Sequence, residues 1–183
     1  MSLVGQNSTC ALNPDTTALA HAQAGGPLHV VVDATGLKVS GVGEWLVEKH
    51  GKRGARTWRK LHLAADPSTG EILASELTSN KEGDASQVGP LLGQLPGPLA
   101  SVTADGACDG EPTYRAVSQR QPDPPLAVVI PPRSTAVPST AAGTTPSQRD
   151  GHIQMIEGKG RMAWQTTTGY GRTRKRQCSA TRP

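Results

Sequence analysis

Two aspartates have the residue type and the setting for divalent-metal chemistry. Asp33 follows the run Val30-Val31-Val32, and Asp105 follows Val102-Thr103-Ala104. A carboxylate at the end of a buried strand is costly to desolvate unless it is paired, hydrogen-bonded or bound to a cation. Because Mg²⁺ prefers oxygen ligands, two such carboxylates on neighbouring strands suit a magnesium site. The alternative is that each aspartate only begins a turn, since Asp33-Ala34-Thr35-Gly36 and Asp105-Gly106 are both good turn sequences.

Hydrophobic periodicity predicts the elements that would position this pair. Apolar or alternating runs predict strands over residues 28–33, 57–66, 71–78, 99–104 and 126–130. A helix is predicted from Asp84 as its capping residue, with apolar positions spaced i, i+3, i+4 and i+7 at Val88, Leu91, Leu92 and Leu95. Further helices are predicted over 112–121 and, more weakly, 153–164. This order favours an α/β fold with a mixed sheet covered by helices.

The net charge of +4 says little about what the folded part binds. Five of the 19 basic residues lie in the last twelve positions, and the other 14 balance the 15 acidic residues. One internal segment is nevertheless rich in basic side chains: Lys49, Lys52, Arg53, Arg56, Arg59 and Lys60. This segment is predicted to contact DNA phosphates, and the alternative is a solvated hairpin tip.

Cysteine usage and hydropathy indicate the compartment. The three cysteines are far apart and form no C-x-x-C pair, which argues against a disulfide framework or a zinc site and fits a reducing cytoplasm. The longest apolar run covers residues 126–130, far below the roughly 20 residues needed to cross a bilayer. We therefore expect a cytoplasmic protein with no membrane partner.

Several blocks of the sequence occur in the order found in one protein family. The segment Gly26–Val39 resembles the first catalytic block of DDE transposases of insertion-sequence family five, and Thr103–Gly110 resembles the second. The family order continues in five further blocks: Gly43-Glu44-Trp45, Arg56–Leu63, Ile130–Arg133, Gln148–Asp150 and Gly169–Arg172. The resemblance therefore covers residues 26–172, most of the chain.

This resemblance implies a fold, a chemistry and a partner. It implies a ribonuclease H-like fold in which Asp33 and Asp105 are the first two members of a catalytic, metal-binding Asp-Asp-Glu triad. The metal implied is Mg²⁺, with Mn²⁺ as a substitute, and the reaction is phosphodiester hydrolysis and strand transfer. The partner implied is DNA, both the element ends and the target, in a bacterial cytoplasm and at the nucleoid when DNA is bound.

The sequence departs from the family at the third carboxylate. In the family, the Gly-Tyr block leads into a helix that bears an Arg, the catalytic Glu and a Lys. Here a basic stretch follows Arg172, Glu157 is the last acidic residue, and Gln177 stands about where the Glu would fall. We therefore expect no third carboxylate, a core that is incomplete at its C-terminal end through truncation or a frameshift, weak metal binding and no activity of the chain alone.

The expected organisation has five segments around one domain. They are a poorly ordered leader (1–27), a ribonuclease H-like core (28–131), a flexible Pro/Ser/Thr-rich insertion (132–150), a remnant of the C-terminal helical region (151–172) and a basic disordered tail (173–183). The chain would associate as a homo-oligomer or with an intact transposase. Two alternatives remain open: a non-catalytic DNA-binding regulator of intact transposases, and an unfolded pseudogene product.

Overall fold

A computed structural model of the chain describes residues 27–38 and 58–171. Its elements follow the order β1 (Leu28–Lys38), β2 (Trp58–Ala65), β3 (Ile72–Ser79), α3 (Asp84–Gly93), β4 (Leu99–Ala104), the 3-10 turn η1 (Gly106–Cys108), α4 (Glu111–Arg120), β5 (Ala127–Val129) and α5 (Gln148–Thr168). The five strands form one sheet in the order β3-β2-β1-β4-β5. The pairs β3/β2 and β2/β1 are antiparallel, whereas β1/β4 and β4/β5 are parallel.

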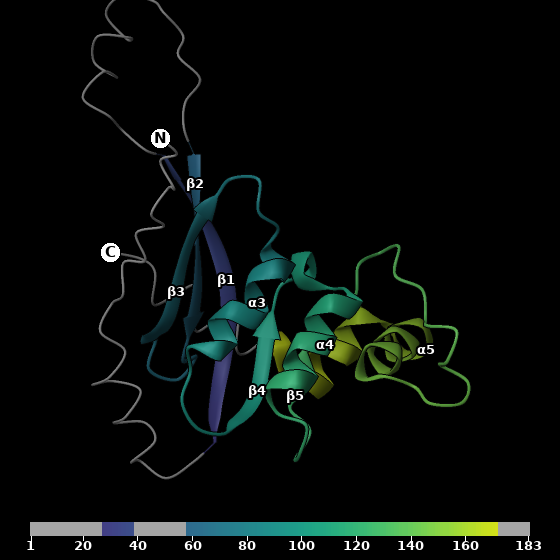
Figure 1. The fold of residues 1–183 in the computed structure, drawn as a ribbon. Coiled ribbons are helices and arrows are strands. Elements are labelled where there is room, and N and C mark those ends of the chain that lie inside the picture. Colours follow the sequence, from purple (N-terminus) through teal and green to yellow (C-terminus); the bar gives the residue numbers. More distant parts are fainter. Residues whose placement is uncertain (1–26, 39–57, 172–183) are drawn as a thin grey trace, which may run out of the picture.

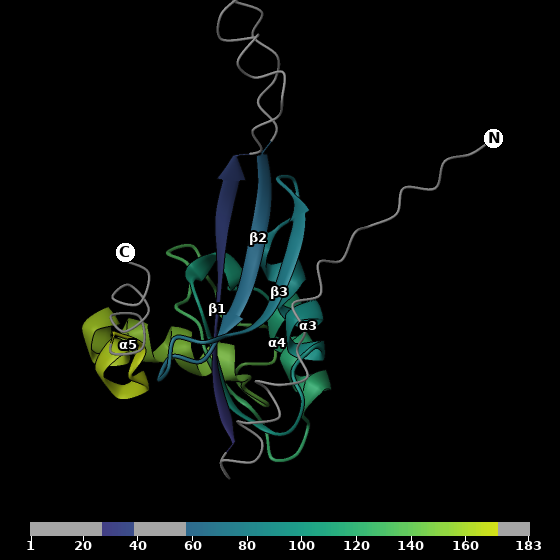
Figure 2. The same cartoon turned by 90° about the vertical axis from the view of Figure 1, so that its left-hand side faces the viewer.

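Helices cover both faces of this sheet, as Figures 1 and 2 show. α3 and α4 lie against one face, and α5 lies on the other side of β1 (Figure 2). The core between the sheet and α3 contains Val30 and Val32 of β1 together with the predicted helix stripe Val88, Leu91, Leu92 and Leu95, which is almost completely buried. The expected α/β class, a mixed sheet with flanking helices, is confirmed, and the arrangement is consistent with a ribonuclease H-like core.

β1 is longer than its apolar run predicts. The run ends at Val32, but the strand continues to Lys38 because its second half pairs with β2, from Asp33 opposite Leu63 to Lys38 opposite Trp58. Asp33 therefore lies within a strand, and the alternative that it begins a turn is wrong.

The ends of two helices also differ from expectation. Asp84 does not cap α3: Gly83 is the N-cap, and Asp84 is the first helical residue. α5 begins at Gln148, inside the predicted insertion, because Ser147 and Asp150 form a capping box in which each side chain accepts the other's backbone N–H. α5 also runs four residues beyond the predicted end at Trp164.

The short strand β5 is bounded by a side chain on its outer side. The Gln148 amide accepts a hydrogen bond from Val128 N at 2.9 Å and donates one to Leu126 O at 2.9 Å. These are the bonds that a further strand would make. Gln121 contacts the backbone N and O of Leu99 in β4 in the same way, at 2.8 and 3.0 Å.

Candidate metal centre

The two aspartates lie next to each other where the parallel pairing of β1 with β4 ends. The last pair of the register joins Val32 to Ala104; Asp33 is the next residue of β1, and Asp105 is the first residue after β4. Asp105 keeps an extended backbone, with φ −80° and ψ 174°. Neighbouring strands lie about 4.8 Å apart, and residues opposite each other in register point to the same face. The geometry therefore brings together two carboxylates that 71 intervening residues separate in the sequence.

A pocket opens at this pair. Its lining consists of three consecutive residues from each strand and one aromatic residue from beyond α5: Val31, Val32, Asp33, Thr103, Ala104, Asp105 and Tyr170. Tyr170 is part of the Gly-Tyr block, but its sequence position alone does not predict a place in this pocket. Its approach to the two aspartates depends on how α5 returns to the sheet, which local sequence does not reveal.

Backbone amides orient both carboxylates. Asp33 Oδ1 accepts the Ala34 N–H at 2.9 Å, and Asp105 Oδ1 accepts the Ala107 N–H at 2.9 Å, which caps η1. Asp105 thus follows the end of β4 and begins a turn, as the alternative interpretation predicted for this position, and it also lines the pocket. Its other oxygen, Oδ2, accepts no hydrogen bond from the described residues and remains available to a cation.

A buried ion pair supports the turn that carries Asp105. Asp109, whose side chain is 0% exposed, binds Arg149 through both carboxylate oxygens, with Nε–Oδ1 at 2.7 Å and Nη2–Oδ2 at 3.2 Å. Hydrogen bonding to Asp109 is the main cause that raises the pKa of the Arg149 guanidinium. Both residues lie in blocks of the family order, but no local pattern indicates that they pair, because 39 residues lie between them.

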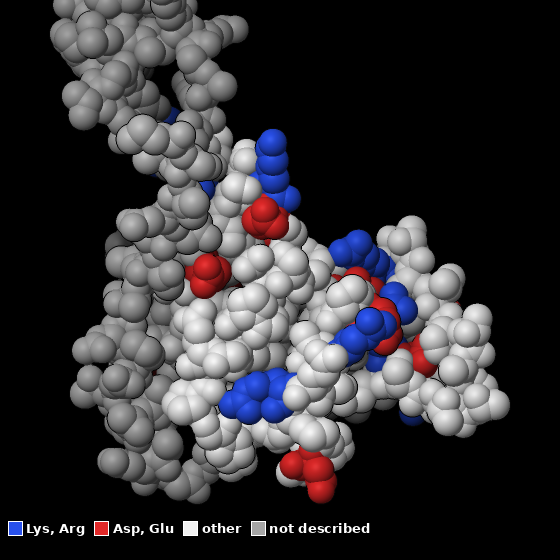
Figure 3. Space-filling view, viewed as in Figure 1, with Lys and Arg blue, Asp and Glu red and all other residues white. Residues whose placement is uncertain are grey.

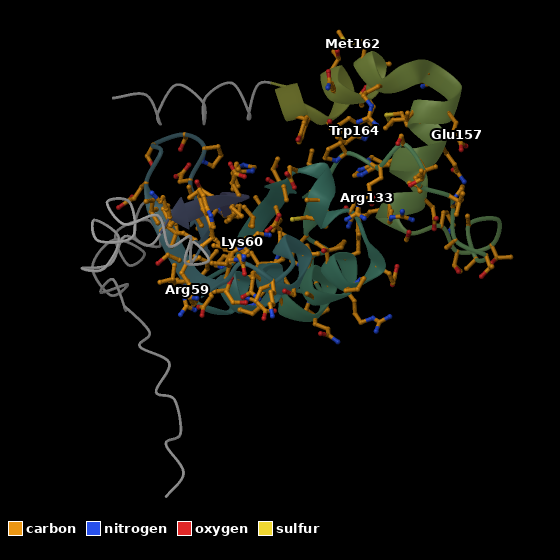
Figure 4. All side chains as sticks on the ribbon, turned by 90° about the horizontal axis from the view of Figure 1, so that it is seen from above. Arg59, Lys60, Arg133, Glu157, Met162 and Trp164 are labelled. Carbon is orange, nitrogen blue, oxygen red and sulfur yellow. The ribbon has the colours of Figure 1, made fainter. Side chains whose placement is uncertain are left out.

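Aromatic packing joins α5 to the pocket. Trp164 is completely buried, and its ring centroid lies 5.3 Å from that of Tyr170 and 5.6 Å from that of His152. Burial lowers the pKa of His152, which favours the neutral imidazole. A kink at Gly160, where φ is 83°, separates the two halves of α5, and a glycine adopts this backbone conformation at little cost. Figure 4 shows Trp164 on the inner side of α5 and Met162 on its outer side.

Comparison with known proteins identifies the family. The family model of the transposase DDE domain matches residues 24–177. The chain belongs to this family. A solved structure, the cryo-EM synaptic complex of piggyBac transposase with hairpin DNA, matches with a TM-score of 0.40 and 14% identity over 61% of this chain. The chain spans 24% of the length of that protein.

The described part of this DDE domain contains no group of three His, Cys, Asp or Glu side chains that could hold a metal ion. Glu157, the last acidic residue of the sequence, is exposed on α5 and does not line the pocket. Figure 4 shows it in the middle part of α5, on the side away from the strands. Among the described residues, the candidate centre therefore has two carboxylates, Asp33 and Asp105.

Only two members of the predicted DNA-binding segment fall on described residues. Lys49, Lys52, Arg53 and Arg56 lie outside them. Lys60 donates to Asp84 Oδ1 at 2.8 Å and to Glu82 O at 3.1 Å, so its charge is largely compensated. Arg59 is exposed and pairs in register with Leu37, which places it on the sheet face of Asp33 and Lys60 on the opposite face.

Positive charge is not concentrated on the face that α3 and α4 form. In Figure 3, basic and acidic side chains of the described residues alternate over this face with neutral surface between them.

None of the described helices is long and apolar enough to span a membrane.

Two buried groups near the carboxylates are held neutral. Burial raises the pKa of the Cys108 thiol to about 12, with a further contribution from the charge of Asp105. Burial lowers the pKa of His62, and the nearby Asp84 opposes this only in part. His62 Nε2 lies 2.9 Å from Thr78 Oγ1, on the α3 side of the sheet. Neither group is therefore suited to act as a nucleophile or a charged ligand in the pocket.

Proposed function

We propose that Asp33 and Asp105 bind a divalent metal ion, Mg²⁺ or Mn²⁺, for phosphodiester chemistry on DNA in transposition of an insertion sequence of family five. The observation that carries this proposal is the convergence in one pocket of two carboxylates on adjacent strands, Asp33 within β1 and Asp105 directly after β4. Two like charges on neighbouring strands repel each other, and a cation between them removes this cost. Membership of the transposase DDE domain family supports the same reading.

The donor set fits such an ion. Carboxylate oxygens are the ligands that Mg²⁺ prefers, and the ion usually retains several water molecules, so two protein ligands are a workable minimum. When bound, divalent ions in such sites activate a water molecule or hydroxyl and stabilise the leaving oxygen of the phosphodiester. The part of this chain is to hold Asp105 through the Ala107 amide and Asp33 through the Ala34 amide, so that both carboxylates point into the pocket.

We further propose that the chain binds this metal weakly and does not transfer strands alone. The sequence contains no acidic residue after Glu157, and the stretch after Arg172 lacks the Arg–Glu–Lys pattern of the family helix. We propose a frameshift near Arg172 as the origin of this change of character. The nucleotide sequence tests it: the explanation requires that another reading frame encodes an Arg–Glu–Lys helix soon after Arg172.

The metal site is tested by titrating the purified chain with Mn²⁺ and following free Mn²⁺ by electron paramagnetic resonance. We expect Asp33→Asn and Asp105→Asn each to weaken binding at least about tenfold, the lower end of what even the loss of an outer-shell partner costs. Asp123→Asn is the matched control, because Asp123 is exposed in the loop before β5 and does not line the pocket. Equal affinity of wild type and both pocket variants would refute the metal site.

Assays of DNA cleavage and DNA binding test the proposed inactivity. With Mn²⁺ and plasmid DNA, we expect no strand cleavage by the wild-type chain, and cleavage that Asp33→Ala abolishes would overturn the proposed inactivity. If the chain binds DNA through its phosphates, we expect the logarithm of the association constant to fall linearly with the logarithm of the salt concentration. Binding that persists unchanged in Asp105→Asn, together with no metal binding, would favour the non-catalytic regulator.

A further inference from the structure

One arginine holds the turn that carries Asp105. Arg133 Nε donates to Gly106 O at 3.0 Å, and Arg133 Nη2 donates to Ala107 O at 2.7 Å. Both carbonyl groups belong to η1, which follows Asp105 directly. A guanidinium presents its donors in a rigid planar fork, so two bonds from one side chain fix the turn more tightly than a flexible ammonium group would.

The orientation of the Asp105 carboxylate depends on this turn. Asp105 Oδ1 accepts its hydrogen bond from the N–H of Ala107, the residue whose carbonyl Arg133 binds. A displacement of Ala107 therefore moves the donor that orients the carboxylate. Functional side chains must be held within roughly 0.5 Å of their productive geometry, so loss of this support is expected to matter for a metal ligand.

Arg133 is itself anchored to the interior. Its backbone N–H donates to Asp109 Oδ2 at 3.0 Å, and Asp109 is the buried carboxylate that Arg149 binds. The chain just before Arg133 also touches the turn, because a Cβ added to Gly106 would lie 3.3 Å from Pro131 O. The guanidinium therefore acts from a fixed backbone, and Figure 4 shows it between the strands and α5.

We propose that Arg133 is a positioning residue for the metal centre: it clamps η1 so that the Asp105 carboxylate points into the pocket beside Asp33. The hydrogen bonds alone support the claim that Arg133 holds the turn. The claim that this affects metal binding rests on the proposed function. Arg133 does not line the pocket, so it acts through Ala107 and not on the ion.

Arg133→Ala in the full chain tests both parts. Without metal, we expect amide hydrogen exchange at Ala107 to accelerate, because its acceptor and its carbonyl both lose their fixed position. With Mn²⁺, we expect about tenfold weaker binding, the usual effect of losing an outer-shell partner. Ethylguanidinium added to Arg133→Ala should restore Mn²⁺ affinity, whereas ethylammonium, which carries the same charge without the fork, should not.

Two further variants serve as controls. Arg115→Ala removes an exposed arginine of α4 for which the described residues provide no hydrogen bond or ion pair, and it should leave exchange and Mn²⁺ affinity unchanged. Arg133→Lys keeps the charge and one donor, so its exchange rate at Ala107 and its Mn²⁺ affinity should lie between those of wild type and Arg133→Ala. It replaces the alanine variant in these assays if Arg133→Ala melts below the assay temperature.

Each outcome bears on one of the two claims. Unchanged exchange at Ala107 in Arg133→Ala overturns the clamp, whatever the metal does. Faster exchange with unchanged Mn²⁺ affinity overturns the positioning role. A wild-type chain that binds no Mn²⁺ refutes the proposed metal site and with it that role, and the exchange result then still decides the clamp.

Discussion

Removing Arg149 should destabilise the protein strongly. Among the described residues, Arg149→Met leaves the Asp109 carboxylate, which is 0% exposed, with the Arg133 N–H as its one partner. Breaking a buried ion pair by removing one partner costs about 3–5 kcal/mol. Because the Arg149 side chain is 19% exposed, water partly reaches the site, and we expect the lower end, about 3 kcal/mol. For a chain of this length that corresponds to a fall in Tm of roughly 6–12 °C.

Urea unfolding of wild type and variants, followed by circular dichroism, measures this cost. Arg149→Lys keeps the charge but loses the bidentate geometry, so its free energy of unfolding should lie between those of wild type and Arg149→Met. The double variant Asp109→Leu/Arg149→Met removes both charges and should recover part of the loss. Arg115→Met, on the exposed side of α4, should change the free energy of unfolding by less than about 0.5 kcal/mol. If Arg149→Met lies within about 1 kcal/mol of wild type, the ion pair does not support the fold as described.

Two other measurements probe the surroundings of the pocket. Because burial lowers the pKa of His62 below 6.5, the unfolded chain binds a proton more readily than the folded one, so the free energy of unfolding should fall as the pH drops below 6.5. His62→Gln should flatten that slope, and an equally steep slope in the variant would contradict the assignment. Gly106→Ala places a methyl group 3.3 Å from Pro131 O and should cost about 1–3 kcal/mol. In Gly89→Ala of α3 the new Cβ meets only Ala116 Cβ at 3.5 Å, so this control should be neutral or stabilising, and a similar loss in both would refute the steric account.

Local sequence patterns predicted the order of the elements because each depends on nearby residues. The stripe from Val88 to Leu95 identified α3, and the β-branched run before Asp33 identified the core half of β1. The other half of β1 was missed because its partner is β2 and its own residues, from Ala34 to Lys38, are mostly exposed. Pairing between distant segments, not hydrophobicity, determines where that strand ends.

The candidate centre was predictable in part for the same reason. Two aspartates after apolar runs indicated the pair, and the parallel register places them together as expected. The support around them was not predictable, since Arg133 and Arg149 reach the turn from 24 or more positions away in the sequence. The polar stretch before α5 was predicted to be a flexible insertion. Ser139 in this stretch nevertheless donates two hydrogen bonds to the buried Asp150 carboxylate at the start of the helix.

The amide of Gln148 has a consequence for self-association. An exposed strand edge offers its unpaired N–H and C=O groups to any other chain, which is a common route to aggregation. At β5, the shortest strand of the sheet, the N–H of Val128 and the C=O of Leu126, which point away from β4, are already hydrogen-bonded to that side chain. We therefore expect copies of this protein not to join their sheets through β5, and any oligomer to form through a different surface.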